Sequence, residues 1–265
     1  MTDYLSVNRC EELAQLLRTA EKEKAGIAPL TAMEPGMSVR DAYQIQLINI
    51  RDKVEGGQKI TGKKIGLTSL AMQHLLGVDQ PDYGFLLESM ECRNHGEISM
   101  QKLMQPKIEA EIAFVLKRDL AGSSVTALDV LLATDYIVPA FEIVDSRIQD
   151  WKIKLEDTVA DNASSGMYLL GENRLRVEEV DMANLGVALY KNGELVNTGV
   201  GSAALGHPAN CVAWLANKLS EYGISLKAGE VILSGALSAA VAVSAGDHCV
   251  ARFAHLGEVG VRFTE

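Results

Sequence analysis

The chain has 265 residues and a net charge of −10, since 35 Asp and Glu outnumber 25 Lys and Arg. Hydrophobic residues make up 48% and charged residues 23% of the sequence, which are ordinary proportions for a globular protein with a full core. The acidic balance argues against nucleic acids and anionic membranes as partners, and no run approaches the roughly 18 apolar residues needed to span a bilayer. An anionic small molecule stays compatible with these values, because local cations can still attract it.

The four cysteines are scattered and include no Cys-x-x-Cys pair: they are Cys10, Cys92, Cys211 and Cys249. Such usage is typical of reduced thiols rather than of a disulfide scaffold. The first residues, MTDYLSVNR, lack the basic stretch followed by an apolar run that marks a secretory signal. We therefore expect a soluble cytoplasmic protein.

Residues 1–57 carry the apolar periodicity of helices. Asn8 is in position to cap a first helix that ends before Gly26. Ser38, with Asp41 three residues later, resembles a capping box that opens a second helix, and a Gly-Gly pair would close it. The start of the chain is thus expected to be mainly helical.

A strand is predicted over residues 59–67, in which Gly62, Lys64 and Gly66 share one face. Glycine on both sides of a lysine leaves room for a ligand beside its ammonium group. The alternative is a twisted strand whose lysine extends along the surface to reach water.

A short helix is expected over residues 69–76, and the composition of residues 80–84 (QPDYG) is that of a turn. Strand patterns predominate after this turn. We therefore divide the chain into a mainly helical N-terminal region at residues 1–80, which includes the lysine strand, and a β-rich domain at residues 81–265.

The β-rich domain begins with a strongly patterned strand at residues 106–116 (PKIEAEIAFVL). Apolar residues recur at every second position from Ile108 to Leu116, so Glu109 and Glu111 share the opposite face. Residues two apart on a strand are about 6.5–7 Å apart along its axis, so the two carboxylates can converge on one ion or one substrate atom. Burying them is costly unless a cation or hydrogen bonds compensate them. The alternative is a solvated strand end whose glutamates pair with the preceding lysine.

A third carboxylate, Glu142, lies within the apolar run at residues 136–144, which follows a helix predicted near residues 126–133. Pro139 in this run indicates a sheet edge or a bulge. If the two glutamate-bearing strands are neighbours, the three carboxylates form an oxygen-only ligand set, which suits Mg²⁺ or Mn²⁺ better than zinc. The five histidines show no ligand spacing.

The rest of the chain alternates strands and turns. Asn192 followed by Gly193 is a hairpin signal, and His207 with Pro208 begins a helix that closes at Gly223. Further strands are expected at residues 230–234, 240–244, 248–254 and 258–263. We therefore expect an α+β fold with a largely β core rather than a doubly wound sheet.

Two other chemistries find little support in the sequence. No Gly-x-Ser-x-Gly motif is present and no cysteine is paired with a histidine in a recognisable context, which argues against a nucleophilic hydrolase. The glycines of residues 199–206 follow a strand, but the third one comes too late for the dinucleotide-binding fingerprint.

Several short blocks resemble the hydratase/decarboxylase branch of the fumarylacetoacetate hydrolase superfamily, in family order from about residue 40 to the end. They are residues 62–69 (GKKIGLTS), 80–84 (QPDYG), 106–113 (PKIEAEIA), 145–151 (DSRIQDW), 157–164 (DTVADNAS), 205–208 (LGHP) and 231–236 (VILSGA). The resemblance implies a mixed β-roll core. It also implies that the β-rich domain is catalytic, with Mg²⁺ or Mn²⁺ held by Glu109, Glu111 and Glu142.

The same resemblance implies an active-site Lys64 and polar catalytic roles for Asp82 and Ser164. Within the branch, the chain is most similar to the hydratases of aromatic meta-cleavage pathways. These add water to 2-hydroxypenta-2,4-dienoate, or its tautomer 2-oxopent-4-enoate, and form 4-hydroxy-2-oxopentanoate. Asp82 follows the hydratases, whereas residues 238–244 (SAAVAVS) follow the sister decarboxylases, and Ser165 stands where many hydratases have cysteine.

The resemblance thus implies a small 2-oxo- or 2-hydroxy-dienoate as substrate and a homo-oligomeric assembly, with a complex formed with a pathway decarboxylase or aldolase as a further expectation. No nucleic-acid or membrane partner is expected. Three alternatives remain open. They are a decarboxylase acting on 2-oxohex-3-enedioate, a C–C bond hydrolase of the superfamily, and a non-catalytic partner subunit that retains the fold.

Overall fold

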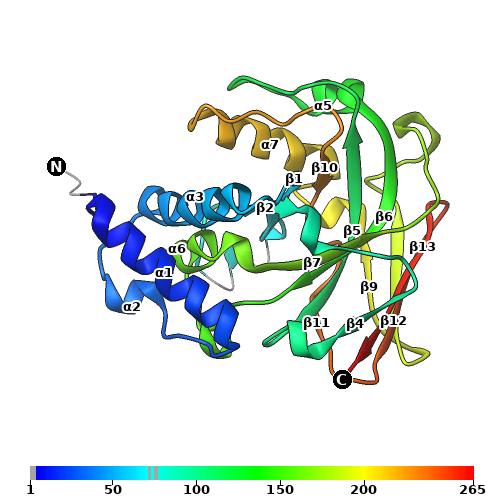
Figure 1. Cartoon of the computed structure of the whole chain (residues 1–265). Helices are drawn as coiled ribbons and strands as arrows, with labels where there is room; N and C mark the ends of the chain where they lie inside the picture. The colour runs from blue at the N-terminus through cyan, green and yellow to red at the C-terminus, as the bar shows by residue number, and fades with distance from the viewer. Residues whose placement is uncertain (1–3, 71–72, 75–76) are drawn as a thin grey trace.

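The computed structural model describes residues 4–70, 73–74 and 77–265. Its helices are α1 (Val7–Glu23), α2 (Leu30–Met33), α3 (Val39–Glu55), α5 (Ala127–Ala133), α6 (Leu155–Ala160) and α7 (Pro208–Ser220). Its strands are β1 (Ile60–Gly66), β2 (Asp82–Leu87), β3 (Glu91–Cys92), β4 (Gly96–Ser99), β5 (Lys107–Leu116), β6 (Thr134–Val144), β7 (Ser165–Leu170), β8 (Gly186–Lys191), β9 (Glu194–Val200), β10 (Val231–Leu233), β11 (Val241–Ala242), β12 (His248–Phe253) and β13 (Gly257–Thr264). Figure 1 shows α1, α2, α3 and α6 on one side of the molecule and β9, β12 and β13 on the other, with the long strands β5 and β6 between them.

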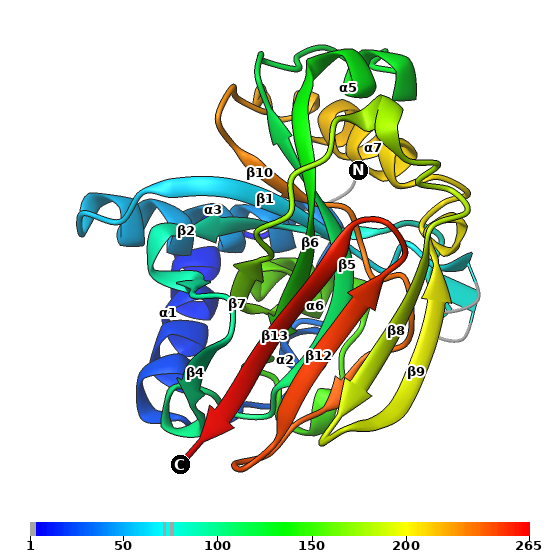
Figure 2. The same ribbon diagram turned by 90° about the vertical axis from the view of Figure 1, so that its right-hand side faces the viewer.

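In the described part of the chain the strands form two sheets. The larger has the order β2-β1-β10-β5-β6-β7-β3, with β11 also paired to β5, and the smaller has the order β4-β13-β12-β8-β9. Figure 2 shows the smaller sheet in front of β5 and β6, and β13 contacts β6. The mixed sheets and segregated helices confirm the predicted α+β class, while the division at residue 80 stays a prediction.

The N-terminal helices begin at polar caps. The Ser38 side chain and Asp41 form the predicted capping box at the start of α3. α1 is capped by Ser6, whose hydroxyl accepts from the Arg9 amide. The prediction of Asn8 as the cap was wrong, because the chain leaves the extended conformation at Ser6 and Asn8 already lies in the first turn. None of the helices in the described segments is both long and apolar enough to cross a membrane.

Two sequence expectations about the strands are corrected by the structure. Asp82, expected in a turn, is the first residue of β2, because pairing with β1 overrides the turn-like composition of residues 80–84. Pro139 is not at a sheet edge, since β6 lies between β5 and β7. The β6–β7 ladder ends at Ala140, so the missing amide of Pro139 costs no bond to β7. The helix expected at residues 69–76 lies partly outside the described residues.

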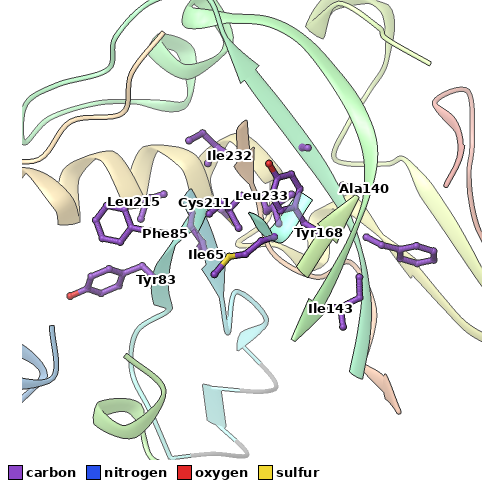
Figure 3. Packing of buried hydrophobic residues seen from close by; sticks show 14 of the residues in the cluster. Ile65, Tyr83, Phe85, Ala140, Ile143, Tyr168, Cys211, Leu215, Ile232 and Leu233 are labelled. Atoms are coloured by element: carbon purple, nitrogen blue, oxygen red, sulfur yellow. The ribbon is translucent and has the colours of Figure 1, made fainter. Parts of the chain in front are cut away.

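A buried cluster fixes the position of β1. Figure 3 shows Cys211 and Leu215 of α7 near Ile65 of β1 and Leu233 of β10, all of them 0% exposed. β1 also pairs in parallel with β10, which joins the N-terminal region to a strand near the end of the chain. Because side chains alternate along a strand, Lys64 points to the face opposite Ile65. That face is the one that carries the candidate site.

A further contact holds α6 against the N-terminal region. The Thr31 amide and hydroxyl, at α2, both donate to the Asp157 carboxylate, at 2.9 and 2.8 Å. Asp157 is 0% exposed, so the contact is well shielded from water. α6 was not predicted from sequence, and it carries a residue of the site described below.

Candidate metal and catalytic site

Three glutamates meet on one face of the β5–β6 ladder. The strands are antiparallel, with Glu109 directly opposite Glu142, and Glu111 lies two residues further along β5. Glu109 and Glu111 therefore point to the same face. One carboxylate oxygen from each of the three lies within 4.8 Å of the others. The structure thus brings together the three carboxylates that the sequence singled out.

These carboxylates are poorly compensated within the protein. Glu111 and Glu142 are 0% and 1% exposed, and Glu109 is half-buried. The Gly235 amide donates to Glu111 Oε2 at 2.8 Å, but Glu111 Oε1 and both oxygens of Glu142 lack hydrogen-bond partners among the described residues. Burial raises the pKa of all three groups, that of Glu142 to about 7, and the charges of its two neighbours also raise the pKa of Glu111. Buried oxygens without hydrogen bonds, in an oxygen-only ligand set, fit a hard divalent cation.

Lys64 extends from β1 to this cluster. Its Nζ lies 3.3 Å from Glu142 Oε1 and 3.7 Å from Asp82 Oδ1, and it donates to the Ala163 carbonyl at 3.0 Å. The side chain is 2% exposed, so the alternative of a lysine extended to water is wrong. Burial by itself lowers the pKa of Lys64, but the carboxylates of Glu142 and Asp82 outweigh it and raise that pKa. Without a bound cation, these carboxylates therefore favour the ammonium form of Lys64.

Asp82 faces Lys64 across the β1–β2 ladder, in register with Gly66. The Thr158 hydroxyl, from α6, donates to Asp82 Oδ2 at 2.7 Å, and its oxygen lies 3.5 Å from Ser164 Oγ. Asp82 Oδ1 has no hydrogen-bond partner in the described structure. The structure therefore places Ser164 next to Asp82 by way of Thr158, a residue that the sequence reasoning missed. Its presence in the block at residues 157–164 was the available signal.

A left-handed turn presents the backbone to Lys64. Asn162, Ala163 and Ser164 have φ angles of 53°, 51° and 52°, which non-glycine residues adopt at a cost. The Asn162 side chain holds this turn on β2, since it accepts from the Phe85 amide at 2.8 Å and donates to the Phe85 carbonyl at 2.9 Å. A Cβ at Gly84 would come within 2.4 Å of the Asn162 carbonyl oxygen. The site thus depends on a strained turn that sequence periodicity cannot identify.

A cavity of about 410 Å³ adjoins Glu109. Its charged lining residues among those described are Lys107 and Glu109, and Ser238 Oγ is buried there with no hydrogen-bond partner in the described segments. Lys107 Nζ lies 4.2 Å from the centre of the Trp151 ring. The alternative prediction, that the glutamates of β5 lie at a solvated strand end, is wrong because Glu111 is fully buried. The remaining lining residues are mostly apolar: Leu67, Thr68, Ser69, Ala203, Ala236, Leu237, Ala239 and Ala240.

Residues 77–264 match the family described as Fumarylacetoacetate (FAA) hydrolase C-terminal. The chain belongs to the fumarylacetoacetate hydrolase family, as its sequence blocks predicted. It is 48% identical over 257 residues to the 2-hydroxyhexa-2,4-dienoate hydratase of Comamonas testosteroni, covering 96% of this chain and 97% of that protein. It is 49% identical over 253 residues to the 2-keto-4-pentenoate hydratase of Paraburkholderia xenovorans (strain LB400), covering 96% and 94% respectively.

A solved structure has the same architecture. The 4-oxalocrotonate decarboxylase from Pseudomonas putida G7, complexed with magnesium and adipate, matches this chain with a TM-score of 0.94 at 42% identity. The match covers 98% of each chain. It confirms the predicted fold of the fumarylacetoacetate hydrolase type.

Proposed function

We propose that the chain is a divalent-metal-dependent hydratase that adds water to 2-hydroxypenta-2,4-dienoate, or its tautomer 2-oxopent-4-enoate, and forms 4-hydroxy-2-oxopentanoate. The observation that carries this proposal is the group of three glutamates beside Lys64 and Asp82, in which Glu111 and Glu142 have buried oxygens without hydrogen bonds among the described residues. The full-length similarity to hydratases named for these substrates supports it. Such a reaction belongs to aromatic meta-cleavage catabolism.

Glu109, Glu111 and Glu142 are proposed as the ligands of Mg²⁺ or Mn²⁺. Their donor atoms are all oxygens, which these ions prefer, and the like charges of the three groups need a cation nearby. When bound, the ion would draw negative charge toward the carboxylate and 2-oxygen of the substrate. The Gly235 amide would keep Glu111 oriented through its hydrogen bond to Oε2.

The remaining residues are proposed to move protons. Lys64 would deliver a proton to C5 of the dienoate and recover the proton that leaves the 2-hydroxyl, which gives an α,β-unsaturated ketone. Water would then add at C4, and the proton that this water loses would be returned at C3, so that the sum of the steps is one added water. Asp82 Oδ1, which has no hydrogen-bond partner in the described structure, is the proposed acceptor for the proton of the attacking water. Ser164 would donate a hydrogen bond to the substrate.

The cavity beside Glu109 is the proposed place for the far end of the substrate. Its mostly apolar lining suits an uncharged vinyl or alkyl end. A dicarboxylate substrate would place its second carboxylate in this cavity, where Lys107 is the cation among the lining residues. The Lys107 ammonium group lies over the Trp151 ring. The mostly apolar lining is the feature that favours a dienoate, whereas Lys107 is the feature that a dicarboxylate would use.

Decarboxylation of 2-oxohex-3-enedioate is the second candidate, favoured by the close match to a decarboxylase structure. Lys64 and the ion held by the same three carboxylates would then stabilise the enolate that is left by loss of CO₂. The two reactions differ in what is consumed and released, so one pair of assays separates them.

The test is to supply the metal-loaded protein with each substrate in turn. We expect loss of the ultraviolet absorbance of the dienoate, formation of 4-hydroxy-2-oxopentanoate, and little release of CO₂ from the enedioate. Faster CO₂ release than dienoate hydration would assign the decarboxylase activity instead. Inactivity on both substrates with several metals would favour a non-catalytic partner subunit.

Localisation and assembly remain proposals from the sequence. The four cysteines are all free thiols in the structure, which suits the proposed reducing cytoplasm. Assembly into a homo-oligomer, and a complex with a pathway decarboxylase or aldolase, can be measured by light scattering and by co-purification with these enzymes.

A further inference from the structure

Thr158 of α6 is a buried residue to which the proposal above gives no role. Its hydroxyl donates to Asp82 Oδ2 at 2.7 Å and lies 3.5 Å from Ser164 Oγ. The residue is 2% exposed, so bulk water does not compete for this bond. The other oxygen, Asp82 Oδ1, lies 3.7 Å from Lys64 Nζ and has no hydrogen-bond partner among the described residues. One carboxylate oxygen is therefore anchored by a hydrogen bond, and the other faces the Lys64 ammonium group without one.

The backbones that carry this contact are tied to each other. Gln46 of α3 is fully buried, and its amide Nε2 donates to the carbonyls of Tyr83 and Val159, at 2.9 and 2.6 Å. Tyr83 and Val159 directly follow Asp82 and Thr158 in the chain. The Gln46 amide group thus fixes the spacing between β2 and α6 at the point where the Thr158 hydroxyl meets the Asp82 carboxylate.

We propose that Thr158 is a positioning residue, whose hydroxyl orients Asp82 so that Oδ1 stays directed toward Lys64 and free to take a proton. This inference rests on the hydratase function proposed above. The last torsion of an aspartate side chain is only broadly restricted, so a hydrogen-bond partner is needed to select one orientation. Misplacing a reacting group by about 1 Å can cost about 100-fold in rate, so loss of the anchor is expected to affect turnover more than substrate binding.

The test compares Thr158→Val, which keeps the shape and removes the hydroxyl, with Thr158→Ser, which keeps the hydroxyl. Thr134→Val is the matched control. Thr134 is also buried, at 1% exposure, and its hydroxyl donates to the Val130 carbonyl at 2.7 Å, at the far end of β6 from Glu142. For each variant, kcat and KM for 2-hydroxypenta-2,4-dienoate are measured at saturating Mg²⁺, and Mg²⁺ affinity is measured by calorimetry.

We expect kcat of Thr158→Val to fall about tenfold or more, with KM and Mg²⁺ affinity within about twofold of wild type. Thr158→Ser should retain most of the turnover, and Thr134→Val should retain wild-type kcat. Circular dichroism verifies folding, and Thr158→Ala, which also lacks the hydroxyl, takes the place of Thr158→Val if that variant does not fold.

The positioning role would be overturned if Thr158→Val or Thr158→Ala had the kcat of the wild type. It would also be overturned if Thr158→Ser lost as much kcat as these variants do. Neither result would affect the proposed hydratase function. A wild-type protein that does not hydrate the dienoate with any divalent metal would overturn the proposed function, and this inference with it. The two failures are distinguished by the activity of the wild-type protein.

Discussion

Lys64 and Asp82 can approach each other because the residue between them in space, Gly66, has no side chain. A Cβ built at Gly66 would lie 2.3 Å from Asp82 Oδ1 and 2.8 Å from Lys64 Nζ. Both distances are shorter than real carbon contacts allow, and neither polar group has solvent into which to move. The prediction that the glycines around Lys64 leave room for a ligand was therefore wrong. Gly66 makes room for Asp82, and Gly62 makes room for the backbone of β10, since a Cβ there would lie 1.9 Å from the Val231 carbonyl oxygen.

Gly66→Ala is expected to displace Asp82 or Lys64 and to lower dienoate turnover by about 100-fold, since about 1 Å of misplacement has that effect. Gly36→Ala is the control, because Gly36 is exposed and an added Cβ there meets nothing within 4 Å. Steady-state kinetics of both variants test this expectation. Equal turnover in Gly66→Ala and wild type would show that the close approach has no functional role.

The three glutamates of the site could be predicted at the residue level because each stands out from the apolar pattern of its own strand. Glu109 and Glu111 share a face by periodicity alone, and Glu142 interrupts an apolar run. The contact between Thr158 and Asp82 spans 76 positions, and no local pattern links two residues so far apart. That part of the site depends on tertiary packing, which only the structure reveals.

Asp247 provides a pH-dependent contribution to stability away from the site. Burial by itself raises the pKa of Asp247, but hydrogen bonds from Lys191, Asn192 and the Ser244 amide outweigh it and lower that pKa. A carboxyl group with a lowered folded pKa stabilises the fold above its unfolded pKa of about 3.9, and this stabilisation is lost as pH falls through the folded pKa.

Asp247→Asn should therefore lower the free energy of unfolding at pH 7, and its difference from wild type should shrink below about pH 4. Urea denaturation of both proteins at pH 7, 4 and 2.5 measures this difference in the free energy of unfolding. Asp135→Asn, at an exposed position outside the ion pairs of the described structure, is the control. A constant difference for Asp247→Asn at all three pH values would contradict the electrostatic explanation.

At the scale of elements, the pairing of β1 with β10 is secured by a buried ion pair. Lys63 Nζ donates to both carboxylate oxygens of Glu230, at 2.6 and 2.7 Å, and the two side chains are 3% and 11% exposed. Lys63 precedes Lys64 on β1, so the same strand carries a lysine in a structural ion pair on one face and the proposed catalytic lysine on the other.

Lys63→Met is expected to destabilise the protein by about 3–5 kcal/mol, because it leaves a buried carboxylate without its cation. Lys59→Met, which removes an exposed pair with Glu88, should change stability by about 1 kcal/mol or less. Denaturant unfolding gives both values. The double variant Lys63→Met, Glu230→Gln should recover part of the loss, and an equal or larger loss would contradict the proposed cause.

Elements with strong local signals matched their predictions, and elements defined by distant partners did not. The capping box at Ser38 and the Asn192-Gly193 hairpin were correctly identified, since their signals lie within a few residues. β2 was mistaken for a turn, because residues 80–84 have turn composition and only pairing with β1 makes them extended. α6 was missed because it has only six residues, too few for a helical period to be distinct.

At the scale of the whole molecule, the site brings together segments that are far apart in the sequence, from Lys64 to Gly235. Lys64 comes from β1, the glutamates come from β5 and β6, and the Gly235 amide follows β10. The order of strands in the large sheet is far from the order in the sequence, so periodicity could predict the strands but not their arrangement. The family resemblance supplied the overall fold that local patterns could not.

A site of this kind couples metal binding to folding. An ion that binds the folded state alone stabilises it by about 2.7 kcal/mol at 100 times its Kd, so Mg²⁺ or Mn²⁺ should raise the Tm of the wild-type protein. Glu142→Gln should lose most of this shift, while Glu97→Gln, at an exposed position on β4, should keep it. Thermal unfolding with and without metal measures the shift, and equal shifts in all three proteins would place the ion elsewhere.

The most direct test of the central proposal is the rate of 2-hydroxypenta-2,4-dienoate hydration by EDTA-stripped protein as Mg²⁺ or Mn²⁺ is titrated back. We expect almost no activity without metal, and saturable recovery in the wild type that Glu142→Gln does not show at the same metal concentrations. Equal hydration rates in stripped and reloaded wild-type protein would contradict the assignment of Glu109, Glu111 and Glu142 as the ligands of a catalytic metal.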